Sequence, residues 1–158
     1  MKVKEFILKK REEEGGPRDF ILSGKAYNKF LQPISEEFKK YSVEMREIIF
    51  FSILLSANHK NDVNTNQNIK FNNDRENDSK ESPKSVFSII DLDTGKFEFL
   101  LSIMINLYGV ESILNYKDMM RKLVQLAEDG LELLYYKFSD DYIRSPAKFA
   151  DDILNGKI

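Results

Sequence analysis

NYKDMMRKLVQLAEDGLELLYYKF, residues 115–138, is the stretch that decides the fold. Its apolar residues recur at intervals of three and four, which predicts one face of an α-helix. The face comprises Met120, Leu123, Val124, Ala127, Leu131, Leu134, Tyr135 and Phe138, and a second ridge of Met119, Leu126 and Leu133 widens it. The opposite, solvated strip comprises Asp118, Arg121, Lys122, Gln125, Glu128, Asp129 and Glu132. A helix of this length spans roughly 36 Å, so its apolar face needs cover from other helices or from a partner.

The composition indicates one soluble domain. The chain has 158 residues, of which 42% are hydrophobic and 32% charged, and it has no cysteine. Its N-terminal apolar segment is too short for a signal peptide, and its longest apolar run is far short of a membrane span. We therefore expect a cytoplasmic protein that does not contact a membrane.

The charge distribution is uneven but mild. The net charge is −2 overall, with +2 in residues 1–57, zero in residues 58–85 and −4 in residues 86–158. A dedicated nucleic-acid-binding domain carries a strong basic excess. The balance therefore disfavours that class without excluding a local basic surface.

Three helices are predicted in the first third of the chain. Residues 2–14 form the first, with basic residues at its start and acidic ones at its end, opposite to what the helix dipole favours. This conflict predicts a weak helix, or an arm that only a partner orders. Asp19 can cap a second helix that Pro33 ends. Ser35 can cap a third helix to about residue 57, whose second half is apolar all round and so should be buried against residues 115–138.

Residues 58–85 change the composition abruptly. Eight of these 28 residues are Asn, and few are large and apolar. Such a segment buries too little surface to offset its ordering entropy. It is predicted to be a disordered or mobile insertion within the single domain, residues 1–158.

The segment that follows allows two interpretations. Ser82-Pro83 signals a restart of structure. A β-hairpin would pair residues 86–90 with residues 96–100, whereas helical spacing extends from Phe97 to Tyr108 and ends at Gly109. The helix is favoured because its spacing holds for longer, and Ser145-Pro146 opens a last short helix. The predicted fold is mainly α, a bundle of five or six helices, with residues 115–138 in the groove between residues 48–57 and 97–108.

The string Ile89-Ile90-Asp91-Leu92-Asp93-Thr94-Gly95 has the residues of two catalytic motifs. An apolar strand followed by Asp-x-Asp resembles the nucleophile motif of haloacid-dehalogenase-like phosphotransferases, which implies Asp91 as nucleophile and Asp93 as acid/base beside a magnesium ion. Asp-Thr-Gly also resembles the aspartic-protease signature. The first family needs a parallel sheet and the second is almost entirely β. Since the flanking sequence is helical, the favoured interpretation is a turn in which Asp93 or Thr94 caps the next helix.

No cofactor, metal site or small-molecule substrate is indicated. His59 has no second His or Cys with which to share a metal or to orient a nucleophile. Gly15-Gly16 lacks the spacing and the trailing Lys of a phosphate-binding loop. The protein is therefore predicted not to be an enzyme, with phosphotransfer at Asp91 and Asp93 as a distant alternative.

Basic residues gather in the N-terminal half. They are Lys9, Lys10, Arg11, Lys25, Lys29, Lys39 and Lys40. If one surface presents them, they could follow a phosphate backbone. The size and helical character also resemble those of small helical subunits of prokaryotic RNA-guided antiviral complexes, which would imply a nucleoprotein assembly. A nucleic-acid-associated subunit is therefore the alternative function.

The leading hypothesis is a non-catalytic helical interaction protein, a subunit of a larger assembly or a homo-oligomer. It rests on the missing catalytic residues, the wide apolar faces and the unbalanced helix 2–14. Tyr136 cannot share a helix face with Tyr135 and should lie nearer the polar side with Arg121. Exposed Tyr near Arg is typical of protein interfaces. The expected interface residues are Tyr136, Arg121 and Phe6.

Overall fold

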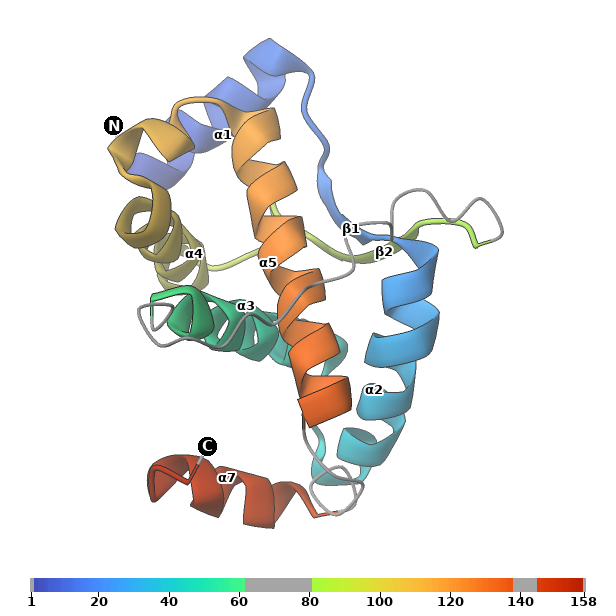
Figure 1. Ribbon diagram of the computed structural model, residues 1–158. Coiled ribbons are helices and arrows are strands. Elements are labelled where there is room, and N and C mark those ends of the chain that lie inside the picture. Colours follow the sequence, from blue (N-terminus) through green and yellow to red (C-terminus); the bar gives the residue numbers. More distant parts are fainter. Residues whose placement is uncertain (1, 62–80, 138–144, 158) are drawn as a thin grey trace.

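The computed structural model describes residues 2–61, 81–137 and 145–157, and α5 (Tyr116–Lys137) runs through the middle of the fold (Figure 1). The described residues contain six α-helices: α1 (Val3–Glu14), α2 (Gln32–Phe38), α3 (Met45–Asn61), α4 (Thr94–Tyr108), α5 and α7 (Pro146–Leu154). The predicted mainly α fold with five or six helices is confirmed. None of these helices is long and apolar enough to cross a membrane.

The contact between α3 and α5 is the most extensive in the fold. A Cβ atom on Gly130 of α5 would stand 1.9 Å from the carbonyl oxygen of Ser52 on α3, so the two backbones touch. Ser52 and Ser56 are fully buried at this side of α3. Small side chains thus let the helices cross closely. The predicted packing of α5 against residues 48–57 is confirmed. α4, the other predicted neighbour, packs on α5 less extensively than α1 does.

The end of α1 is fastened to the start of α5. The Glu14 carboxylate accepts from the backbone N–H of Tyr116 at 2.7 Å, and the Tyr116 hydroxyl donates to the Pro17 carbonyl at 2.7 Å. Burial raises the pKa of Tyr116 to about 12, and nearby Arg11 opposes this shift. The acidic end of α1 therefore places a carboxylate at the N-terminus of α5, where the helix dipole favours negative charge. The expectation of an arm that only a partner orders is wrong, because α1 is formed and bonded within the chain, whereas the expected weakness of this helix stays a prediction.

A two-stranded antiparallel sheet joins the halves of the chain. β1 (Asp19–Leu22) pairs with β2 (Lys84–Ser88), with a bulge where Phe20 gives way to Ile21. The rings of Phe20 and Phe87 stack with centroids 5.0 Å apart. The predicted helix beginning at Asp19 is therefore wrong. The restart after Ser82-Pro83 is a strand, and its nearest partner in sequence is 62 positions earlier (Leu22 opposite Lys84), a pairing that local patterns do not reveal.

A helix passes through Pro33 instead of ending there. It begins at Gly24, widens into the π-helical segment η1 (Ala26–Leu31) and continues as α2 and the short η2 (Lys39–Tyr41). Pro33 cannot donate to the carbonyl one turn earlier, and the wide turn before it leaves room for its ring. The predicted continuous helix from Ser35 to residue 57 is also wrong, since Ser42 adopts a positive φ of 60° and separates η2 from α3.

Two acidic residues of α5 lie in the core instead of on the predicted solvated strip. Glu128 and Asp129 are buried. The Glu128 carboxylate accepts from the backbone N–H of Ser23 at 2.9 Å and from its hydroxyl, and Ser23 Oγ in turn accepts from the N–H of Ala26. Asp129 pairs with Lys60 at 3.4 Å. Glu128 thereby holds the start of the helix that leads into η1.

The later elements agree better with the sequence. Helix, not hairpin, is confirmed beyond residue 94, and Asp93 caps α4 by accepting from the Lys96 N–H at 2.9 Å. The predicted last helix corresponds to α7. The predicted insertion at 58–85 has wrong bounds, because residues 58–61 belong to α3 and residues 84–85 to β2. Its centre, residues 62–80, lies outside the described residues, as does Phe138.

Candidate protein-binding site

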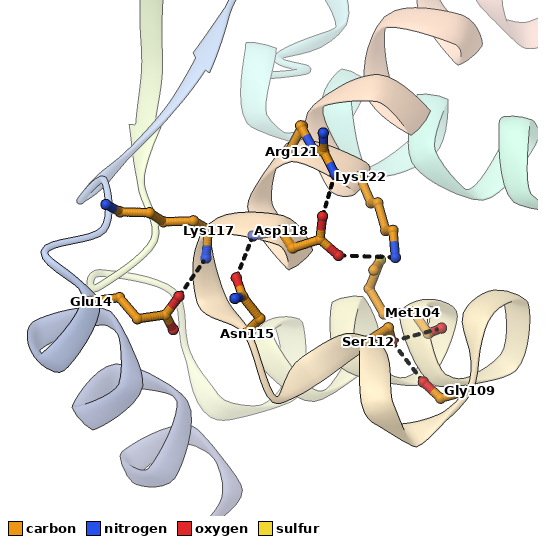
Figure 2. A network of polar contacts seen from close by, with 9 residues as sticks. All are labelled: Glu14, Met104, Gly109, Ser112, Asn115, Lys117, Asp118, Arg121 and Lys122. Carbon is orange, nitrogen blue, oxygen red and sulfur yellow. Dashed lines mark hydrogen bonds and ion pairs between the residues drawn. The ribbon is translucent and has the colours of Figure 1, made fainter.

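The chain reverses sharply where α4 ends. Gly109 has a φ of 84°, and its N–H donates to the Ile105 carbonyl at 2.8 Å. The short helix η4 (Val110–Ile113) then folds back on α4, and the buried Ser112 hydroxyl bonds the carbonyl oxygens of Met104 at 3.3 Å and Gly109 at 2.7 Å. Figure 2 shows Ser112 between these two partners. The hydroxyl thus holds the reversal in place.

This reversal leaves an apolar surface uncovered. Its members are exposed by 37% (Ile105), 38% (Tyr108), 61% (Val110) and 50% (Leu114). These four residues, all within ten positions of chain, are called the α4–η4 patch below. Ile103 and Ile113 in the same stretch face the core and are buried. The stretch therefore has apolar side chains on both its inner and its outer side, and Asn106 and Glu111 are exposed among the outer ones.

Charged residues of α5 border the patch. Lys122 Nζ lies 5.0 Å from the centroid of the Tyr108 ring. Asp118 pairs with Lys122 at 3.1 Å and with Arg121 (Figure 2). The hydrogen bond from Lys122, followed by that from Arg121, lowers the pKa of Asp118, so this carboxylate is ionised and the two cations are held beside the patch. The arrangement, an apolar centre with a charged rim, is that of a protein-binding surface.

The three predicted interface residues do not lie together. Arg121 is at the rim of the α4–η4 patch, whereas Tyr136 is fifteen residues further along α5, roughly 22 Å away. Phe6 is half-buried on α1, with Lys10 Nζ 5.8 Å from its ring centroid. The four patch residues were missed, because helical spacing assigns Ile105 and Tyr108 to a core face. The signal that could have found them is the density of apolar residues between 103 and 114, too high for one buried face.

The predicted basic surface is divided between two ends of α5. Lys9, Lys10 and Arg11 lie on α1 beside the start of α5. The other four lie toward the end of α5 (Figure 1): Lys25 just before η1, Lys29 in η1, and Lys39 and Lys40 in η2. Glu13 pairs with Lys9 at 4.0 Å and with Lys10 at 3.6 Å, and Glu37 pairs with Lys40 at 3.3 Å. Acidic neighbours therefore offset much of this charge, and the seven residues do not share one surface.

One predicted basic residue does meet a predicted interface residue. Lys29 Nζ lies 5.3 Å from the ring centroid of Tyr136, which is 58% exposed. The Tyr136 hydroxyl raises the pKa of Lys29. The Tyr136 ring also meets Phe30 edge to face, with centroids 5.7 Å apart. An exposed aromatic ring beside a cation can take part in protein or nucleic-acid contacts.

An open pocket of about 600 Å³ lies where α2 passes into α3. Its lining residues are Gln32, Ser35, Glu36, Lys39, Ser42, Val43, Glu44 and Met45. Two members of the predicted basic set remain. Lys39 lines this pocket, whereas Lys25 is half-buried just before η1. Neither this pocket nor any other group of the described residues gathers three His, Asp or Glu side chains that could hold a metal ion.

The Asp91–Gly95 string forms a turn and a helix cap. Asp93 accepts from the backbone N–H of Lys96 and pairs with its side chain at 3.1 Å. The backbone hydrogen bond, followed by the side-chain one, lowers the pKa of Asp93. The described residues contain only an antiparallel pair of strands, not the parallel sheet that the phosphotransferase motif needs. His59, expected in a loop, lies in the last turn of α3.

Comparisons with known proteins point to no relative: no family model matches the chain, and neither the curated proteins nor the solved structures give a match. The functional conclusion therefore depends on the surface and packing of this chain alone.

Proposed function

We propose that this chain is a non-catalytic helical interaction protein that joins a larger assembly or a homo-oligomer through the α4–η4 patch. The observation that carries the proposal is the exposure of four large apolar side chains within ten positions of chain, Ile105, Tyr108, Val110 and Leu114. Single exposed apolar residues are common on any protein, whereas several in one short stretch beside charged residues favour an interaction site.

The chemistry of the patch supports this proposal. Tyr108 offers a large ring with a polar tip, a residue type enriched in interfaces, and Arg121 stands at the rim. Ser112 and Gly109 hold the reversal rigidly, so little ordering entropy is lost when a partner binds. The partner is expected to present an apolar surface of similar size with compatible charges.

Photo-crosslinking can test the proposal in the native host. A photoreactive amino acid at Val110, the most exposed patch residue, should give one discrete adduct, because a bound partner covers this side chain. The same group at Glu12, on the exposed side of α1 with 73% of its side chain accessible, is the matched control and should give none. Adducts would be analysed by mass spectrometry. Equal labelling at both positions, or no adduct at Val110, would rule the patch out as a binding surface.

Nucleic acid is the second candidate partner, and the pair of Lys29 and Tyr136 favours it. Single-stranded nucleic acid binds where basic side chains follow its backbone and aromatic rings stack on its bases. Lys25 lies one turn before Lys29 on the same helix and could add a phosphate contact. The surface is small, and Glu132 stands near it.

Fluorescence polarisation with a labelled single-stranded RNA tests this candidate. Lys29→Glu should weaken binding by about tenfold, since it removes a phosphate contact and repels the backbone, and the affinity should fall steeply with salt. Lys9→Glu, the same charge reversal on α1, should leave the affinity unchanged. Binding that is absent, indifferent to salt, or equally sensitive to both substitutions would remove the pair as a nucleic-acid site.

A further inference from the structure

We infer that Asn155 and Gly156 form a self-modification site, at which the asparagine side chain loses ammonia and becomes aspartate or isoaspartate without an enzyme. The inference is independent of the proposed function, because it concerns the end of α7 and not the α4–η4 patch. The dipeptide Asn-Gly occurs once in the sequence. It follows directly on the last residue of α7, Leu154, and both of its residues are exposed.

The reaction joins the backbone to the side chain. The backbone nitrogen of Gly156 attacks the Cγ atom of Asn155, and the carboxamide nitrogen leaves as ammonia together with the proton of the attacking nitrogen. The product is a cyclic imide. Water then opens the ring at either of its two carbonyl carbons, which gives aspartate or isoaspartate and adds a carboxylate. Water is the only co-reactant, and no oxidant or reductant takes part.

Glycine after the asparagine removes the main steric barrier to this attack. A Cβ atom on the following residue would crowd the attacking nitrogen, whereas glycine has none. A Cβ atom placed on Gly156 would meet nothing within 4 Å, so the space around this peptide group is open. Gly156 has a φ of 68°, in the left-handed region that glycine commonly adopts at helix ends. The ring therefore has room to form.

Few contacts hold the dipeptide in place. The N–H of Asn155 donates to the Asp151 carbonyl at 3.0 Å, and the N–H of Lys157 donates to the Asp152 carbonyl at 2.8 Å. The second bond is the one expected where a helix ends in a left-handed glycine. The Asn155 carboxamide has no hydrogen-bond partner among the described residues. Terminal helix turns open readily, so the Gly156 nitrogen can reach Cγ while the core stays folded.

The other exposed asparagines of the described ranges lack this combination. They are Asn28, Asn58, Asn106 and Asn115, and each precedes a residue that has a side chain. Asn28, Asn58 and Asn106 lie inside η1, α3 and α4. The side chain of Asn115 is engaged, since its Oδ1 accepts from the N–H of Asp118 at 2.9 Å. These asparagines are therefore internal controls.

The modification changes the end of α7. A carboxylate at position 155 joins Asp151 and Asp152 near the C-terminus of the helix, where the helix dipole disfavours negative charge. It also competes for the ammonium group of Lys157, which pairs with Asp152 at 3.9 Å. Isoaspartate further lengthens the backbone by one carbon atom, which displaces the N–H of Lys157 from the Asp152 carbonyl. The last turn of α7 is therefore expected to loosen as the protein ages.

Ageing of the full chain tests the inference. Incubation for several days in a slightly alkaline buffer should convert Asn155 to a mixture of aspartate and isoaspartate, located by fragmentation mass spectrometry of its peptides. The rate should rise in proportion to hydroxide concentration, because the Gly156 nitrogen attacks after losing its proton. Asn58, Asn106 and Asn115 should keep their amides over the same period.

Two substitutions identify the chemistry. Asn155→Gln lengthens the side chain, which disfavours the ring, and should abolish conversion at this position. Gly156→Asn keeps a residue type that tolerates a positive φ but restores a Cβ atom, and should slow the conversion of Asn155 severalfold. An Asn155 that keeps its amide as long as Asn106 does, or a conversion rate that Gly156→Asn leaves unchanged, would overturn the inference.

Hydrogen exchange follows the consequence for α7. The backbone amide of Lys157 should exchange faster in the aged parent chain than in the fresh one, because its bond to the Asp152 carbonyl is lost. Aged Asn155→Gln is the matched control and should exchange as the fresh variant does. Unchanged exchange in a chain that has been converted at Asn155 would refute the loosening of α7.

Discussion

Gly130→Ala is expected to destabilise the protein by about 3 kcal/mol, an effect near the upper end of overpacking substitutions. The added methyl group would stand 1.9 Å from the carbonyl oxygen of Ser52 and 2.8 Å from its Cα atom. Both obstructing atoms belong to the backbone of α3, which cannot rotate away as a side chain can. The helices must separate, and buried contacts along their whole crossing loosen.

Thermal and urea unfolding followed by circular dichroism would measure this loss. The intrinsic preference of helices for Ala over Gly, about 1 kcal/mol, acts in the opposite direction. Gly95→Ala isolates that preference, because its added Cβ meets nothing closer than Asp93 Oδ1 at 3.4 Å in the first turn of α4. This control should be neutral or slightly stabilising. Equal stability of the Gly130 variant and the parent would contradict the close crossing of α3 and α5.

Glu128→Ala is the second substitution expected to have a large effect, also about 3 kcal/mol. It removes the acceptor of both the N–H and the hydroxyl of Ser23, leaves that N–H unsatisfied and opens a space in the core. Glu128→Gln keeps one acceptor oxygen and should lose less. The same unfolding measurements apply to both variants.

Glu12→Ala provides the control for Glu128. Glu12 is an acid on a helix of the same protein, but its side chain is 73% exposed. Its replacement should change the free energy of unfolding by less than about 0.5 kcal/mol. If the substitution at Glu128 were as harmless as this one, the carboxylate would not be holding the start of the helix before η1.

Periodicity predicted the helices well where one apolar face determines the local structure. The spacing in α5 and α4 identified both helices and the face that α5 turns toward α3. The Asp93 cap was also predictable, because the capping interaction lies within four residues of chain. These features depend on neighbours in sequence, which a single chain displays directly.

The errors arose where partners are distant in sequence. Glu128 looks solvated on a helical wheel, but it is buried where it accepts from Ser23, 105 positions earlier. Phe20 was assigned to a helix because its strand pairing, opposite Phe87, is nonlocal. Pro33 was taken as a helix end because the π-helical turn that accommodates it leaves no sequence signal. The α4–η4 patch was missed for a related reason: spacing shows which residues are apolar, but not which of two apolar sides remains uncovered.

The fastening of the first 31 residues to α5 has a consequence for synthesis on the ribosome. The bonds from Tyr116 to Glu14 and to Pro17, and from Ser23 to Glu128, join positions 99 to 105 residues apart. At about 5–20 residues per second, translation takes roughly 5–20 s to cover such a separation. Through that interval α1 and β1 have no α5 to cover Ile7 and Phe20, both fully buried in the end. The first 31 residues must therefore wait for the emergence of α5 before their buried side chains are covered, so the domain closes late.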